Sequence, residues 1–268
     1  MAIFNPRPMN ASKRFETQGY IILKKLFEKV EIDKISFIVE RIYDQWRQEN
    51  YPALIAQQLV NMHSLTHPKY FCHSSERVEF FNLIASAKLT NALEQIFSKG
   101  IYFHNTQLFF NPYSTQKQPY WHRDLQYSPI EDSVQAAEQP RMTSLHARIP
   151  LLAEKGIELI PDSHTRWDTE LEHNVRFEFN GHRNCEPLPG SVLIQLEPGD
   201  VLIFSAQMIH RGNYHLNPKR RALDLCLGKP HRLVSSFLDI TGLPSDTEME
   251  HIHQRQWYTL AKTIASNV

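Results

Sequence analysis

Three residues of this 268-residue chain have the types and spacing of a metal site. His122 and Asp124 are two positions apart, so in a β-strand both side chains would point to one face and Arg123 would point away. Another histidine, His210, follows the apolar run 201–204, which is expected to be a strand. Two histidines and one carboxylate form the facial triad that holds iron(II) and leaves coordination positions open. The pattern therefore predicts one iron(II) site at His122, Asp124 and His210.

The His-x-Asp spacing alone is a weak signal, because the chain has 14 histidines and 29 acidic residues. A lone pair of this kind is more often a hydrogen-bonded pair on the surface. The downstream order raises its specificity. Gly199 and Asp200 form a turn before the apolar run, and Arg220 and Arg221 follow His210 by ten and eleven positions. A guanidinium there could bind a carboxylate of a co-substrate through two parallel hydrogen bonds.

Alternation along residues 220–227 distinguishes the two arginines. Arg220 would share a strand face with Ala222 and Asp224, while three leucines occupy the other face. Small and polar residues suit the interior of a barrel, and leucines suit packing against helices. We therefore prefer Arg220 as the carboxylate-binding arginine and expect Arg221 to be exposed.

Apolar spacing predicts helices in the first hundred residues and strands after them. Residues 15–23 indicate a helix end, a turn at Gly19 and a buried strand. Spacings of three and four predict helices over 32–46 and 78–99, and a further helix over 247–265 follows a capping box. Short β-rich segments lie between them, at 102–110, 143–151, 157–160, 191–196, 201–204 and 221–227.

Several short strands separated by turn residues are typical of a sandwich or barrel. The expected fold class is mostly β with flanking helices. We expect one domain over residues 1–268, with a helical part over about 1–100, a β core over about 101–228 and a helical tail over 229–268. The polar segment 166–186 is interpreted as a loop or a mobile flap.

Composition argues against several classes of protein. The formal net charge is zero, which disfavours a nucleic-acid binder or a protein of anionic membranes. No apolar run approaches the roughly 18 residues of a membrane span. Three widely spaced cysteines, none in a Cys-x-x-Cys pair, favour a reducing cytoplasm and do not indicate structural zinc. Residues 1–8 lack the pattern of a signal peptide, so we expect a cytoplasmic protein.

The ordered motifs resemble those of the phytanoyl-CoA dioxygenase family of iron(II)- and 2-oxoglutarate-dependent oxygenases. The resemblance covers about residues 15–228. The opening segment 15–24 (FETQGYIILK) is similar to the family's entry into the barrel. Residues 122–129 (HRDLQYSP) look like its iron-binding segment, and residues 156–164 (GIELIPDSH) resemble its Gly-x-Leu-x-x-x-Pro-Gly-Ser-His turn. The Gly-Asp, His and Arg elements over 199–223 complete the order.

The resemblance implies a double-stranded β-helix core, which is a cupin-like jelly roll. It also implies that His122, Asp124 and His210 hold iron(II) and that an arginine binds the far carboxylate of 2-oxoglutarate. Family members often place this arginine eleven residues after the metal histidine, which points to Arg221. The Arg-x-Ala pattern points instead to Arg220, which we prefer.

Five residues around the predicted ligands carry further expectations. Asp162 replaces the glycine of the family's turn, and the turn can survive because Asp tolerates a left-handed backbone. Gln107 either hydrogen-bonds 2-oxoglutarate or is a polar residue at a sheet edge. Trp121 and Tyr127 either wall the site or belong to the core. His146 lies in a predicted strand and could face the barrel interior beside metal or substrate.

The implied activity is hydroxylation of a small molecule with O2, with 2-oxoglutarate converted to succinate and CO2. Three alternatives are a non-catalytic metal-binding jelly-roll protein, a zinc hydrolase with the same ligands, and an oxygenase acting on a protein or nucleic acid. The arginine after His210 disfavours the first, the absence of a His-Glu-x-x-His motif the second, and the neutral charge a nucleic-acid substrate. The primary substrate, whether it is a CoA ester, and the oligomeric state stay open.

Overall fold

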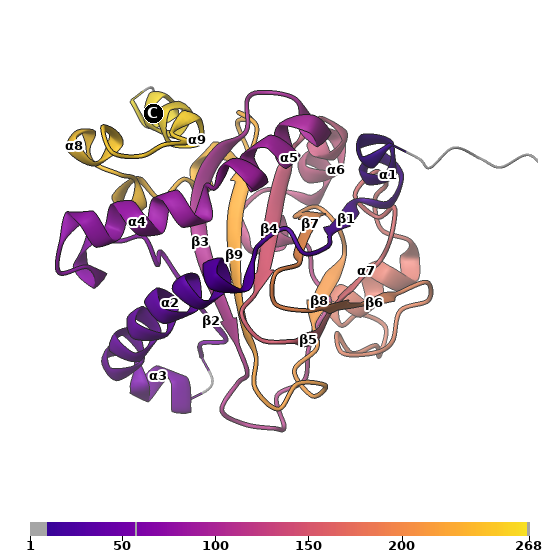
Figure 1. Cartoon of the computed structure of the whole chain (residues 1–268). Helices are drawn as coiled ribbons and strands as arrows, with labels where there is room; N and C mark the ends of the chain where they lie inside the picture. Colours follow the sequence, from indigo (N-terminus) through magenta and orange to yellow (C-terminus); the bar gives the residue numbers. More distant parts are fainter. Residues whose placement is uncertain (1–9, 57, 267–268) are drawn as a thin grey trace, which may run out of the picture.

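A computed structural model describes residues 10–56 and 58–266 of the chain (Figure 1). Residues 1–8, where no signal peptide is expected, lie outside the described residues. Helix α1 (Ala11–Gln18) ends at Gly19, whose φ of 79° places it in the left-handed region that glycine adopts without strain. Strand β1 (Tyr20–Leu23) follows directly. The predicted helix end, glycine turn and strand are confirmed.

Two antiparallel sheets form the centre of the molecule. The larger sheet has the strand order β1, β7 (Val201–Ser205), β4 (Ser144–Pro150), β9 (Arg221–Gly228), β3 (Tyr102–Phe110) and β2 (Asn61–His63). The smaller sheet has the order β6 (Val192–Leu196), β5 (Glu154–Leu159) and β8 (His210–Gly212). The two sheets pack together, because one buried apolar cluster contains Phe204 of β7 and Leu159 of β5. This arrangement is the expected jelly-roll core with flanking helices.

Helices cover the outer face of the larger sheet. Helices α2 (Lys29–Glu49), α4 (Ser74–Ile84) and α5 (Ala87–Phe97) run across this sheet in Figure 1. Their apolar residues share the main core with Leu223, Leu225 and Leu227 of β9. The alternate residues of β9 therefore point into the space between the sheets. No helix in the described part of the chain combines the length and apolar character needed to cross a bilayer.

The helix predicted over 78–99 is wrong in one respect, because it is two helices. Helix α4 ends at Ala85, and Ser86 takes an extended conformation (φ −59°, ψ 151°) as the N-cap of α5. Neither glycine nor proline marks this break. Strands β2 and β8 were also not predicted, because each has only three residues. Smaller helices are α3 (Tyr51–Ile55), α6 (Asp132–Glu138) and α7 (Glu170–Phe177).

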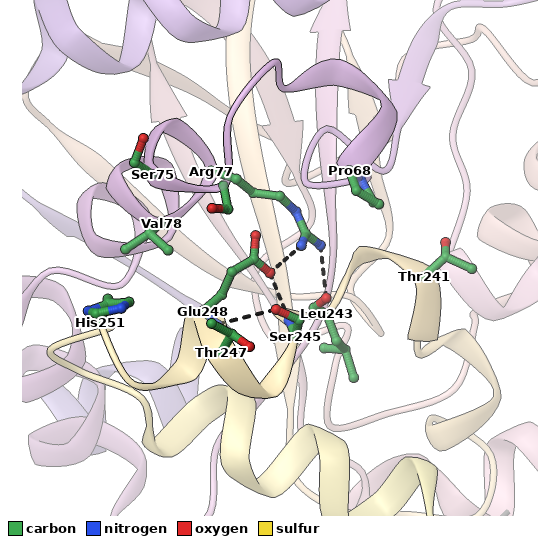
Figure 2. A pocket seen from close by; sticks show the side chains of 11 residues that line it. Pro68, Ser75, Arg77, Val78, Thr241, Leu243, Ser245, Thr247, Glu248 and His251 are labelled. Atoms are coloured by element: carbon green, nitrogen blue, oxygen red, sulfur yellow. Dashed lines mark hydrogen bonds and ion pairs between the residues drawn. The ribbon is translucent and has the colours of Figure 1, made fainter.

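The tail is likewise divided, so the single helix predicted over 247–265 is wrong. The capping box at Ser245 starts only the short α8 (Asp246–Met249), and α9 (Gln256–Ala265) follows separately. Arg77 of α4 holds this tail in place (Figure 2). Its guanidinium donates to Glu248 Oε2 at 2.5 Å and to Leu243 O at 2.8 Å. A cavity of about 710 Å³ lies beside this ion pair.

Candidate metal centre

The side chains of His122, Asp124 and His210 converge between the two sheets. One nitrogen or oxygen atom from each lies within 4.8 Å of the others. Asp124 Oδ1 lies 3.4 Å from Nε2 of His210 and 3.8 Å from Nε2 of His122. Within residues 10–56 and 58–266, this is the group of histidine, cysteine and acidic side chains that could hold a metal ion. The structure therefore brings together the three residues that the sequence singled out.

The backbone that places them differs from the predicted strand. His122 makes only an isolated β-bridge, in which it exchanges two 3.0 Å backbone hydrogen bonds with His210 of β8. Asp124 then begins the 3₁₀ helix η2 (Asp124–Tyr127). The bridge sets the two histidines opposite each other, and the turn at Asp124 brings the carboxylate back toward them. The expectation that both residues lie in one strand is therefore wrong, although their side chains do meet.

Arg123 points away from the two ligands, as expected. Its Nε and Nη2 donate to Asp168 at 2.9 and 2.7 Å, and its Nη1 donates to Ser163 O and Gln207 O. Arg176 of α7 also pairs with Asp168. Asp168 and Arg176 are each about 1% exposed at the side chain, so the segment 166–186 is held by buried ion pairs. The interpretation of this segment as a loop is wrong for Glu170–Phe177, which form helix α7, and is confirmed for residues 178–186, which contain no helix or strand.

Hydrogen bonds set the tautomers of both histidines. Nδ1 of His122 lies 3.1 Å from the carbonyl of Tyr120, and Nδ1 of His210 lies 3.0 Å from the carbonyl of Met208. A carbonyl oxygen only accepts, so each Nδ1 carries the hydrogen and each Nε2 keeps its lone pair. Burial lowers the pKa of His122 and lowers the pKa of His210 to about 3. Both imidazole rings are therefore neutral at pH 7, and each can donate the lone pair of its Nε2 to a metal ion.

Asp124 offers one oxygen to the same point. Its Oδ2 lies 2.7 Å from Nε2 of His146, which leaves Oδ1 toward the two Nε2 atoms. Burial would raise the pKa of Asp124, but His146, His210 and His122 outweigh burial and hold the pKa below its usual range. Two neutral imidazoles and one carboxylate oxygen are the donor set of a facial triad. The residues present therefore fit an iron(II) ion.

The two candidate arginines point to opposite faces of the larger sheet. Arg220 is 2% exposed, and its Nε donates to Glu154 Oε1 at 2.6 Å. No residue in the described part of the chain accepts a hydrogen bond from its Nη1 or Nη2. Arg221 instead pairs with Glu40 of α2 at 3.0 Å and lies 4.2 Å from the ring centroid of Tyr43. Arg221 is therefore packed under the helices, which corrects the expectation that it is exposed.

A glycine makes room for the Arg220 guanidinium. A β-carbon at Gly212 of β8 would lie 2.8 Å from Arg220 Nη1 and 2.9 Å from Nη2. Gly212 is two residues after His210, so the guanidinium lies against the strand that carries one candidate metal ligand. The rings of Phe109 and Tyr214 lie 5.5 and 5.9 Å from the guanidinium carbon. The two Nη atoms therefore lie against Gly212 and have no hydrogen-bond acceptor among the described residues.

Gln107 faces the interior but already has a partner. It lies opposite Asp224 in the β3–β9 register, so both side chains share the inner face. Its Oε1 accepts from Asn61 Nδ2 at 3.3 Å.

Two aromatic residues flank the candidate metal ligands in the sequence. Of these, Trp121 is fully buried in an apolar cluster. Tyr127 is 62% exposed, and its ring centroid lies 5.6 Å from the ring centroid of the candidate ligand His122.

From the sequence, His146 was expected only as a residue that could face the barrel interior, and Arg148 and Glu154 were not identified. His146 and Arg148 are two apart on β4 and both face the interior, where Arg148 lies opposite Asp224 of β9. Burial opposes protonation of His146, but the carboxylates of Asp124 and Asp224 raise its pKa to about 10. The available signal was the alternation of His and Arg within the otherwise apolar residues 145–150. A buried arginine in such a position calls for carboxylate partners.

The turn after β5 keeps its shape with Asp162 in place of glycine. Asp162 has a φ of 67°, the left-handed conformation predicted for it. Its Oδ1 accepts from Arg166 Nε at 2.9 Å. The next residue, Ser163, gives its carbonyl to Arg123, so the turn packs behind the segment that carries two candidate ligands.

A sequence model of one protein family, described as phytanoyl-CoA dioxygenase, matches residues 15–223. Two similar proteins are ectoine dioxygenases. That of Bordetella parapertussis is 22% identical over 94% of this chain and 84% of its own length. That of Sphingopyxis alaskensis is 24% identical over 81% of this chain and 75% of its own.

Solved structures share the fold. AviO1 from Streptomyces viridochromogenes superposes with a TM-score of 0.56 and 18% identity over 82% of this chain and 94% of its own. EctD from S. alaskensis, solved with 2-oxoglutarate and 5-hydroxyectoine, superposes with a TM-score of 0.52 and 20% identity over 85% of this chain and 79% of its own.

Proposed function

Because the chain belongs to the phytanoyl-CoA dioxygenase family, we propose that His122, Asp124 and His210 hold its iron(II) ion and that Arg220 binds 2-oxoglutarate. The protein is an iron(II)- and 2-oxoglutarate-dependent dioxygenase that acts on a small molecule. One observation carries the residue assignment: three lone-pair donors converge on one point, while Arg220 presents two Nη atoms with no acceptor among the described residues beside the strand of His210.

Each residue has a defined task in this proposal. When bound, iron supplies the redox chemistry that activates O2 and oxidises 2-oxoglutarate to succinate and CO2. His122 and His210 donate from Nε2, because their Nδ1 hydrogens are held by carbonyls. Asp124 donates from Oδ1, because His146 occupies its Oδ2. Arg220 forms two charge-assisted hydrogen bonds with the far carboxylate of 2-oxoglutarate, which fixes the orientation of the co-substrate.

Gln107 can offer 2-oxoglutarate fewer hydrogen bonds than Arg220 can. Its Oε1 is taken by Asn61, so only its Nε2 is left to donate to 2-oxoglutarate. We propose that Gln107 makes this single hydrogen bond from β3, on the inner face of the sheet. We also propose a cytoplasmic protein, which agrees with three free cysteines, Cys72, Cys185 and Cys226, because a reducing compartment keeps thiols unpaired.

The alternatives fit the geometry less well. A protein that only stores metal needs no arginine near the metal site whose Nη atoms lack an acceptor among the described residues. In a zinc hydrolase that uses a carboxylate as general base this group must be free, whereas Asp224 and Glu154 are both held by Arg148. Nucleic acid as substrate is disfavoured by the formal net charge of zero. Hydroxylation of a small molecule therefore remains the proposed reaction.

Succinate release provides the test. Candidate small molecules are added to protein loaded anaerobically with iron(II) and 2-oxoglutarate, oxygen is admitted, and succinate and oxidised product are quantified by mass spectrometry. We expect substrate-stimulated succinate release that requires iron. In parallel, His210→Ala should lose bound iron while circular dichroism shows a retained fold. Full iron occupancy in this variant would overturn the ligand assignment, and iron-independent turnover would overturn the proposed reaction.

A further inference from the structure

Six polar side chains form a continuous hydrogen-bonded series between the two sheets, in the order Asp124, His146, Asp224, Arg148, Glu154 and Arg220. We call it the polar series. It begins at a proposed iron ligand and ends at the proposed co-substrate anchor. Its four inner residues contact neither iron nor 2-oxoglutarate in the proposed arrangement, and of these only His146 has a part in it, through its contact with Asp124.

The half nearest the metal passes through a histidine. Nε2 of His146 lies 2.7 Å from Asp124 Oδ2, and its Nδ1 lies 3.1 Å from Asp224 Oδ2. The ring of His146 is stacked on Phe204, with centroids 4.9 Å apart and planes 14° apart. This stacking restricts rotation of the imidazole, so the position of one carboxylate constrains the position of the other.

The half nearest the co-substrate passes through an arginine. Nη1 of Arg148 donates to Asp224 Oδ1 at 2.8 Å. Its Nε and Nη2 donate to the two oxygens of Glu154 at 2.8 and 2.6 Å. Glu154 Oε1 also accepts from Arg220 Nε at 2.6 Å. A planar guanidinium bound on both edges cannot turn toward one partner without breaking its bonds to the other.

Because these side chains are buried, each hydrogen bond in the series is costly to break. The side chains of Arg148, Asp224, Glu154 and Arg220 are 1–3% exposed. In such surroundings a polar group that loses its partner is not rescued by water, and a buried ion pair that loses one member is strongly destabilised. A shift at one end of the series therefore moves the next member rather than leaving a gap.

We propose that the polar series couples the two binding sites, so that altering Glu154 beside the co-substrate anchor weakens iron binding at Asp124 even when 2-oxoglutarate is absent. The inner residues act as positioning residues for both ends. The proposal rests on the proposed roles of Asp124 and Arg220. A purely structural role, in which the charges only neutralise one another, predicts loss of stability without any coupling between the ends.

The test measures iron(II) binding alone. The dissociation constant is determined anaerobically without 2-oxoglutarate for the unaltered protein, for Glu154→Gln, for His146→Asn, and for the double variant. His146→Asn keeps a polar group near Nδ1 but removes the contact from Nε2 to Asp124. The matched control is Glu248→Gln, which alters a carboxylate that is also buried and paired with an arginine, but lies outside the polar series. Circular dichroism verifies that each variant is folded.

Glu154→Gln should raise the iron dissociation constant by roughly 2- to 30-fold, although it is four links from Asp124. His146→Asn should raise it by roughly 10- to 100-fold, and adding Glu154→Gln to it should cause little further loss. Glu248→Gln should leave it unchanged. An unchanged constant in Glu154→Gln, an equal loss in Glu248→Gln, or a full additional loss in the double variant would refute the coupling.

A second pair of variants covers the case in which Glu154→Gln fails to fold. Asp224→Asn can replace both of the hydrogen bonds of Asp224, whereas Asp224→Ala removes both. We expect near-normal iron binding in the first and weakened binding in the second, and equal constants would refute the coupling. The proposed ligand set fails separately, since it would be refuted by undiminished iron binding in Asp124→Ala.

Discussion

Replacing Arg220 by glutamine should weaken 2-oxoglutarate binding far more than the same change at Arg221. The Nη atoms of Arg220 have no acceptor among the described residues and lie against Gly212 of the strand that carries His210, whereas Arg221 lies on the opposite face of the sheet against Tyr43. Leaving a buried carboxylate without its charged partner costs about 3–5 kcal/mol. At about 1.4 kcal/mol for each factor of ten, the dissociation constant should rise by at least about a hundredfold.

The structure also indicates that Arg220→Gln should fold. Glu154 loses one hydrogen bond but keeps both of its bonds to Arg148. Binding of 2-oxoglutarate is measured by calorimetry on anaerobic, iron-loaded protein, with circular dichroism as the check of folding. Arg221→Gln serves as the matched control, because it removes an ion pair of the same type on the helix side of the strand. The opposite ranking of the two variants would transfer the role to Arg221 and refute the argument from strand alternation.

Three further predictions follow from single residues. Gly212→Ala would place a methyl group 2.8 Å from Nη1 of Arg220, so the 2-oxoglutarate dissociation constant should rise by roughly tenfold; an unchanged constant would contradict this. Burial would raise the pKa of Glu154, but Arg148 and Arg220 lower it to about 2 from 4.5, so this carboxylate stabilises the fold above pH 4.5 and its contribution, roughly 3 kcal/mol, is lost as the pH falls toward 2. Urea unfolding should therefore show the stability gap between unaltered protein and Glu154→Gln closing toward acid, and a constant gap would refute the assignment. Asp162→Ala should lower the free energy of unfolding by about 1 kcal/mol relative to Asp162→Gly, because alanine strains at a φ of 67°; equal denaturation midpoints would argue against a left-handed turn.

The types and order of the chemical residues were enough to predict which side chains meet. His122, Asp124 and His210 lie together, and alternation along β9 correctly separated Arg220 from Arg221. The separation of the two arginines succeeds because side-chain alternation in a strand is a local property. The strand predicted through His122 and Asp124 failed for the same reason, since a spacing of two fits both a strand and a β-bridge followed by a 3₁₀ turn.

Features that depend on distant parts of the chain were not predicted. Arg148 and Glu154 become intelligible only when Asp224, 76 residues after Arg148, is placed opposite it in the sheet. The break between α4 and α5 has no glycine or proline, and only the extended backbone of Ser86 reveals it. In both cases tertiary packing decides between local conformations that the sequence leaves nearly equal.

Arg123 has a consequence for how far such a chain can diverge. Three of the acceptors that hold its guanidinium are main-chain carbonyls, at Ser163, Arg166 and Gln207. A main-chain carbonyl is present whatever side chain the residue carries, so these three hydrogen bonds to Arg123 do not depend on which residues occupy the positions. Among the described residues, Asp168 is the acceptor that holds Arg123 through its own side chain. The support of the metal-binding segment by Arg123 can therefore persist through substitutions at Arg166 and Gln207, whereas the Ser163 hydroxyl is also needed, because it accepts from the backbone N of Ile209 next to His210.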